Sequence, residues 1–154
     1  RVGFGAGPRA LVRAMATVQG HATAGVCAPA QAAAAAALDG PQDDAERMRD
    51  AYRRRRDLVV DALAGVPGLR CHRPEGAFYV FPSVAGLIGR RSEGGRLLAT
   101  DEDVCMAILE EAHVATVFGA AFGMSPFLRL SCATGDDLLA EACRRIARFC
   151  HAVR

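Results

Sequence analysis

The sequence contains no lysine, because all 19 of its basic residues are arginine. A glycine-rich phosphate loop that depends on a lysine is therefore excluded. The serine, histidine and aspartate residues also lack the order of a hydrolytic triad. The preference for arginine, together with 16 glycines and many alanines, is consistent with a GC-rich genome.

Long apolar runs are missing as well. The longest run, Ala28 to Leu38, is mostly alanine and is too short to cross a bilayer. The first residues do not form the basic and then apolar pattern of a secretion signal. A net charge of +2 is too small to attract nucleic acid or anionic lipid over a distance. We therefore expect a cytoplasmic protein whose partners include neither nucleic acid nor a membrane.

Paired metal-binding or disulfide motifs are absent from the sequence. The four histidines form no spaced cluster, and Cys71 next to His72 is poor ligand spacing for zinc. None of the cysteines forms a Cys-x-x-Cys pair; they are Cys27, Cys71, Cys105, Cys132, Cys143 and Cys150. We predict buried free thiols and no bound metal.

The 154 residues are enough for one compact domain or for parts of two. Helical spacing predicts helices from Pro8 to about Gly20, from Pro29 to Leu38 and over about 43–64, the last with Met48 on its apolar face. A capping box at Thr100 predicts another helix through Ala112. A final helix is expected after a cap formed by residues 134–137. Its predicted buried stripe is Leu138, Leu139, Ala142, Ile146 and Phe149.

Extended segments are expected at residues 69–72, 76–81, 114–118 and 127–132, with a long loop from Ser83 to Ala99. After residue 65 the order is strand, strand, helix, strand, strand, helix. This order predicts an α/β fold with a small, mainly antiparallel sheet. The glycine-containing apolar run that starts at Arg1 resembles a strand already under way, so we expect the natural polypeptide to extend upstream.

Four consecutive arginines, Arg53 to Arg56, have two interpretations. They could form an anion or nucleic-acid patch, or they could be the solvated flank of a helix. The second interpretation is favoured, because four successive positions point to all sides of a helix and no aromatic stacking platform accompanies them. Asp50 and Asp57 are also spaced to compensate Arg54 and Arg53 within the helix.

Arg129 lies within the apolar run from Phe127 to Ser131, where an unpaired charge is costly. A guanidinium on a strand offers a rigid pair of donors that matches a carboxylate. Alternation along a half-buried strand would equally allow Arg129 to face solvent. Spacing alone leaves both possibilities open. The nearby Gly119 and Gly123 bracket a tight connection, for which turn geometry is a sufficient explanation.

Several segments occur together in a characteristic order. They are residues 1–4, 52–57, 74–79, 121–123 and 128–131, the last followed by Ala133-Thr134. The ordered set resembles the C-terminal part of fold-type-I pyridoxal-phosphate aminotransferases over essentially the whole chain. The glycines of the 83–100 loop are similar to those of bacterial aspartate aminotransferases, some of which also act on prephenate.

The resemblance implies roles for three residues. Arg129 corresponds to the arginine that pairs with the α-carboxylate of the amino-acid substrate. Arg1 corresponds to the arginine that binds the cofactor phosphate, and Phe78 to an aromatic residue that lines the substrate pocket. Residues 1–50 would be the tail of the large cofactor domain and residues 51–154 the small C-terminal domain, connected by the helix over about 43–64.

The implied reaction transfers an amino group between an amino acid, with aspartate as the leading donor, and a 2-oxo acid. Pyridoxal phosphate is the implied cofactor, in a homodimeric full-length enzyme. The family needs a Schiff-base lysine, which this chain lacks, so no catalytic residue is assigned and the chain alone should be inactive.

Two segments depart from the family pattern. Residues 20–27 replace a polar segment that reaches toward the neighbouring subunit, and Phe118 stands where proline is common. An inactive aminotransferase-like protein is therefore one alternative. A non-catalytic α/β interaction module that uses Arg53 to Arg56 is the other.

Overall fold

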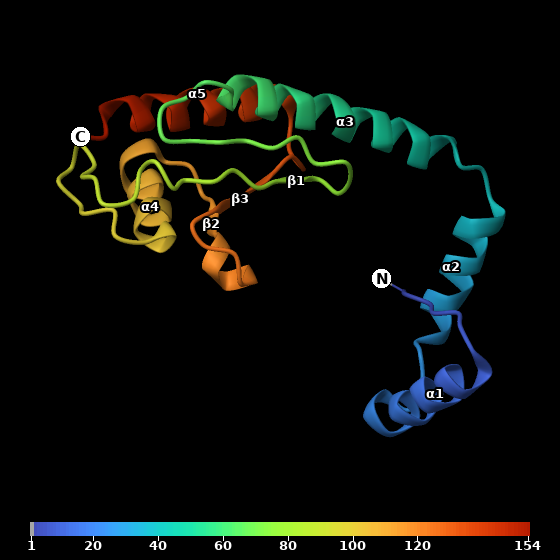
Figure 1. The fold of residues 1–154 in the computed structure, drawn as a ribbon. Coiled ribbons are helices and arrows are strands. Elements are labelled where there is room, and N and C mark those ends of the chain that lie inside the picture. The colour runs from blue at the N-terminus through green and yellow to red at the C-terminus, as the bar shows by residue number, and fades with distance from the viewer. Residues whose placement is uncertain (1) are drawn as a thin grey trace. The chain divides into compact units, whose positions relative to one another are not determined.

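The computed structural model describes residues 2–154 (Figure 1). The chain divides into two compact units, one ending at Arg47 and the other running from Met48 to Arg154, and each is described by itself. Arg1, the expected phosphate-binding residue, lies outside the described residues.

The first unit is formed mainly by α1 (Arg9–Thr23) and α2 (Ala28–Asp39). Helix α1 continues beyond the predicted end near Gly20 and stops where Ala24 adopts a left-handed conformation, at φ 60°. Neither helix contains a buried residue. The apolar side chains of Leu11, Met15 and Val18 are 55%, 50% and 68% exposed. This unit therefore lacks a core of its own. Since packing of an apolar face supplies most of a helix's stability in a protein, α1 and α2 need a surface to pack against.

Helix α3 (Asp43–Leu63) has the bounds expected from the sequence to within one residue. Asp43, Asp44 and Glu46 lie in its first turn, where negative charge interacts favourably with the helix dipole. Val59, Val60 and Leu63 are buried at its C-terminal end. Met48, one of the apolar positions of the predicted helix, is 56% exposed.

Helix α4 (Asp101–Ala107) begins with the predicted capping box. The Thr100 side chain accepts a hydrogen bond from the Asp103 backbone N–H, and the Asp103 side chain accepts one from the Thr100 backbone N–H. The helix continues as the π-helical turn η1 (Ile108–Ala112). It ends at His113, which has a left-handed φ of 55°. The predicted end at Ala112 is therefore confirmed.

Helix α5 (Asp136–Ala152) differs from the expectation in two details. Gly135 precedes it and no side chain caps its first turn, so the predicted cap from residues 134–137 is wrong. Leu138 is 67% exposed and does not belong to the buried stripe. The residues of this helix that are buried are Leu139, Cys143, Ile146, Phe149 and Cys150.

The sheet contains β1 (Tyr79–Val80), β2 (Val117–Phe118) and β3 (Leu128–Ser131) in the order β1-β3-β2, and both pairs are antiparallel. The expected small antiparallel sheet is confirmed, but each strand is shorter than predicted. The segment 69–72 forms only an isolated bridge between Arg70 and Ser83. The predicted strand at 69–72 is therefore wrong. Its apolar residues suggested a strand, but a strand also requires a pairing partner along its length.

One hydrophobic core joins the helices and the sheet of the second unit. The strands contribute Val80, Leu128 and Leu130, and the long loop 83–99 contributes Val84, Leu87 and Leu98. That loop is therefore part of the core although it contains no helix. Among residues 2–154, no helix has the combination of length and apolarity that a bilayer span requires.

Candidate functional site

Arg129 lies on the central strand of the sheet, opposite Val117 of β2. Its neighbours Leu128 and Leu130 are 1% and 9% exposed and face the core. Because side chains alternate along a strand, Arg129 is on the opposite face together with Tyr79, whose Cα partner in β3 is Ser131. Arg129 itself is half-buried.

Two aromatic rings enclose the Arg129 guanidinium. Its Cζ lies 4.6 Å from the ring centroid of Tyr79 and 4.5 Å from that of Phe122. Both distances are within the range of a cation–π contact. The N–H groups of a guanidinium point outward in its plane. Rings that contact its faces therefore leave these N–H groups available to bind a partner. Within residues 2–154 no carboxylate forms an ion pair with Arg129.

Phe78 reaches the same group of side chains. Its ring centroid lies 4.6 Å from that of Tyr79 and 5.5 Å from that of Tyr52. Two of the predicted site residues, Phe78 and Arg129, are thus both in contact with Tyr79. Phe78 is 39% exposed, as a residue available to a ligand must be.

Tyr79 and Phe122 were not predicted as site residues. Tyr79 was placed only within an extended segment, and the turn that contains Phe122 was attributed to backbone geometry. The sequence did offer one signal for them: residues 78, 79, 81 and 122 are all aromatic, and each group lies close to a glycine. These rings continue past Arg129, since Phe122 packs edge-on against Phe81 with centroids 6.1 Å apart.

Phe78 also lines a cavity of about 320 Å³ on α3, whose charged walls are Arg49, Arg53, Arg56 and Glu75. The arginine cluster does not form a single basic patch around it. Arg54 and Arg55 bind the Asp136 carboxylate at 3.2 and 2.8 Å, and Arg56 donates to Asp57.

Part of the charge of this cluster is compensated within its own helix, as expected, but by Arg56 with Asp57 and not by the pairs predicted from spacing. Arg54 pairs with Asp136 at the start of α5, 82 residues away, instead of with Asp50. Hydrogen bonds from Arg55 and Arg54 hold the pKa of the Asp136 carboxyl below its usual range. The cluster therefore joins α3 to α5, and much of its charge is neutralised.

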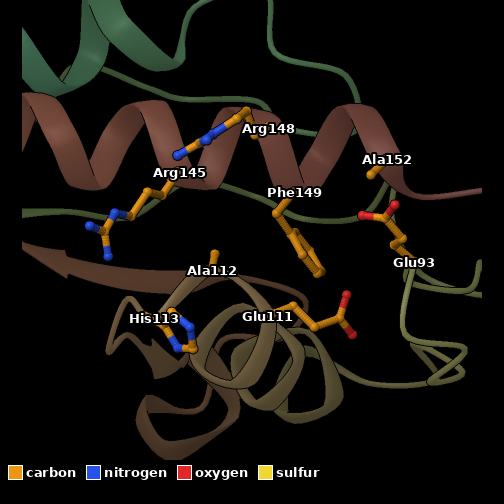
Figure 2. A pocket seen from close by; sticks show the side chains of 8 residues that line it. All are labelled: Glu93, Glu111, Ala112, His113, Arg145, Arg148, Phe149 and Ala152. Atoms are coloured by element: carbon orange, nitrogen blue, oxygen red, sulfur yellow. The ribbon is translucent and has the colours of Figure 1, made fainter.

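A second cavity, of about 350 Å³, lies between α5 and the end of η1 (Figure 2). Arg145 and Arg148 extend from α5, and Glu93 extends from the long loop. Two of its charged groups already have partners, because Arg145 binds Glu141 and Glu111 accepts from Ser92. Neither Arg129 nor Phe78 lines this cavity.

The described residues hold no cluster of three metal-ligating side chains, and all six cysteines are free. The prediction of free thiols is confirmed, but their predicted burial is not met by Cys27, which is exposed, or by Cys71, which is half-buried. Burial raises the pKa of Cys143 to about 11 and that of Cys150 to about 12. Both groups therefore stay protonated at neutral pH.

The difference in exposure between Cys27 and Cys150 predicts which thiol is alkylated first. At pH 8 we expect Cys27 to react with iodoacetamide in the native chain. Cys150 should react at least about a hundredfold more slowly, because only the thiolate attacks. Peptide mass spectrometry at timed intervals measures both rates. Urea should bring the two rates together, and equal rates without urea would contradict the buried position of Cys150.

Comparison with known proteins gives a consistent result. The family model described as aminotransferase class I and II matches residues 1–146. The chain is 52% identical over 150 residues to the aspartate/prephenate aminotransferase of Cereibacter sphaeroides, which covers 97% of this chain and 38% of that protein. It is 49% identical to an aspartate aminotransferase of Rhizobium meliloti, with 97% and 37% covered.

Solved structures agree with the sequence relatives. The crystal structure of the Rhizobium meliloti aspartate aminotransferase matches with a TM-score of 0.87 and 48% identity, over 96% of this chain and 37% of that one. An aromatic aminotransferase from Pyrococcus horikoshii matches with a TM-score of 0.75 and 35% identity, over 93% and 36%. The chain thus spans well under half the length of these relatives and corresponds to their C-terminal portion. It belongs to the class I and II aminotransferase family.

Proposed function

We propose that this chain is the C-terminal part of an enzyme that transfers an amino group between an amino acid and a 2-oxo acid. Aspartate is the leading amino donor, since the similar curated proteins are named aspartate or aspartate/prephenate aminotransferases. The observation that carries the proposal is the Arg129 guanidinium, enclosed by Tyr79 and Phe122 and without a carboxylate partner among residues 2–154.

In this proposal Arg129 binds the α-carboxylate of the substrate. A guanidinium presents two parallel N–H donors to a carboxylate, and such charge-assisted pairs are among the strongest hydrogen bonds in proteins. The rings of Tyr79 and Phe122 restrict its rotation, so less side-chain entropy is lost on binding. Phe78, whose ring contacts that of Tyr79, is proposed to line the substrate pocket.

Pyridoxal phosphate is the proposed cofactor of the full-length enzyme, where it supplies an electron sink for the substrate α-carbon. A guanidinium is a suitable donor for phosphate, so the side chain type at Arg1 fits the phosphate end. The covalent anchor requires a lysine, and this chain has none. We therefore propose that the chain alone is inactive and contributes recognition of the substrate carboxylate and the cofactor phosphate.

We further propose that residues 1–50 belong to the large cofactor domain and residues 51–154 to the small domain of a homodimeric enzyme. The absence of buried residues in α1 and α2 supports this assignment, because these helices need an apolar surface from elsewhere. The division of the structure after Arg47 is close to the proposed boundary.

Borohydride reduction tests the proposal. The full-length polypeptide that contains this chain is incubated with pyridoxal phosphate, reduced and digested, and its peptides are analysed by mass spectrometry. We expect one pyridoxyl-modified lysine outside residues 1–154 and none in this chain, which serves as the matched control. A full-length protein without any such adduct would refute the enzymatic assignment.

A further inference from the structure

The turn that carries Phe122 is attached to helix α4 by one buried carboxylate. Asp101, the first residue of α4, is 1% exposed. Its Oδ2 accepts hydrogen bonds from the backbone N–H of Ala120, at 3.0 Å, and from that of Phe127, at 3.4 Å. Because a buried carboxylate needs such donors, the two bonds fix the turn at Ala120 and the chain that follows it at Phe127 relative to α4.

The turn itself, η2 (Gly119–Phe122), has little internal freedom. The Gly119 N–H donates to the Phe127 carbonyl at 2.7 Å, and the Met124 N–H donates to the Gly119 carbonyl at 3.0 Å. A Cβ on Gly119 would collide with the Met124 carbonyl oxygen, so the chain can close in this way only with glycine. The segment from Gly119 to Phe127 therefore behaves as one rigid loop.

The ring of Phe122 depends on the position of that loop. It is 48% exposed, so burial in the core does not hold it in place. Its ring contacts are with Phe81 and with the guanidinium of Arg129. A displacement of the loop backbone would consequently remove one of the two rings that enclose Arg129.

We propose that Asp101 is a positioning residue for substrate binding, whose carboxylate fixes the loop that holds Phe122 against Arg129. Asp101 acts through Phe122 and does not itself contact the substrate. The inference rests on the proposed function, since it assumes that Arg129 binds the substrate carboxylate.

The test uses the full-length enzyme with Asp101→Ala, Phe122→Ala and the double variant. A loosened carboxylate-binding group weakens substrate binding more than the chemical step, so we expect Asp101→Ala to raise KM for the amino donor about tenfold with kcat changed less than about twofold. Phe122→Ala should have a similar effect. The double variant should be no worse than the worse single variant, because both changes remove the same contact.

Asp103→Ala is the matched control. It removes the capping box from the same first turn of α4 but has no bond to the loop, so KM should stay at the wild-type value. Asp101→Asn keeps an oxygen acceptor of lower charge, and we expect it to raise KM about threefold. This variant provides a measurement even if Asp101→Ala does not fold.

Two results would overturn the inference. The first is a wild-type KM in Asp101→Asn together with a raised KM in Phe122→Ala. The second is a double variant whose KM increase is the product of the two single increases, since independent effects multiply. An Arg129→Ala enzyme with unchanged KM would refute the proposed function instead, so the two failures are distinguishable.

Discussion

Replacing Arg129 with alanine in the full-length enzyme is expected to lower kcat/KM for the amino donor about 30- to 5,000-fold, because removing one partner of a hydrogen-bonded charge pair costs about 2–5 kcal/mol. Steady-state kinetics measure the change. The α-carboxylate is common to all amino acids, so the relative loss should be similar for aspartate and for alanine.

Two variants serve as controls for this result. Arg129→Lys keeps the charge but loses the paired donors, and we expect about a tenfold loss. Arg54→Ala removes a guanidinium that binds Asp136 and is largely exposed, so kcat/KM should be unchanged. A loss that is confined to aspartate would indicate that Arg129 contacts the side-chain carboxylate and would contradict the assignment.

The isolated 154-residue chain is expected to self-associate. Its first unit exposes Leu11, Val12, Met15 and Val18 of α1, and none of the residues of α1 or α2 is buried. Contiguous apolar surface of this kind promotes association in water. We expect a concentration-dependent mass above that of the 16.2 kDa monomer in sedimentation or light-scattering measurements.

A truncated chain of residues 48–154 provides the comparison. It keeps the hydrophobic core, whose residues all lie between Val59 and Val153, and lacks α1 and α2. We expect it to be much less associated and to unfold cooperatively in urea, as small domains with one core do. A compact monomer of the full 154-residue chain at all concentrations would contradict this explanation.

The sequence by itself determined the helices and the family. The capping box at Thr100 is a local signal, and the start of α4 next to it followed from it. The start of α3 at Asp43 and the end of η1 at Ala112 were also expected from the sequence. The ordered segments predicted an aminotransferase, which the comparisons confirm at the level of the family. The small antiparallel sheet was also correctly expected.

Only the tertiary structure decided the surroundings of Arg129 and the length of the strands. Spacing left its side chain equally free to face a ligand or solvent, and the contacts that enclose it come from Tyr79, 50 positions earlier, and from the turn at Phe122. The partner of Arg54 is likewise distant in sequence. Helices depend on hydrogen bonds and side-chain periodicity among neighbouring residues, so the sequence alone predicts them. Strand pairing and cation–π contacts join segments that only the folded chain brings together.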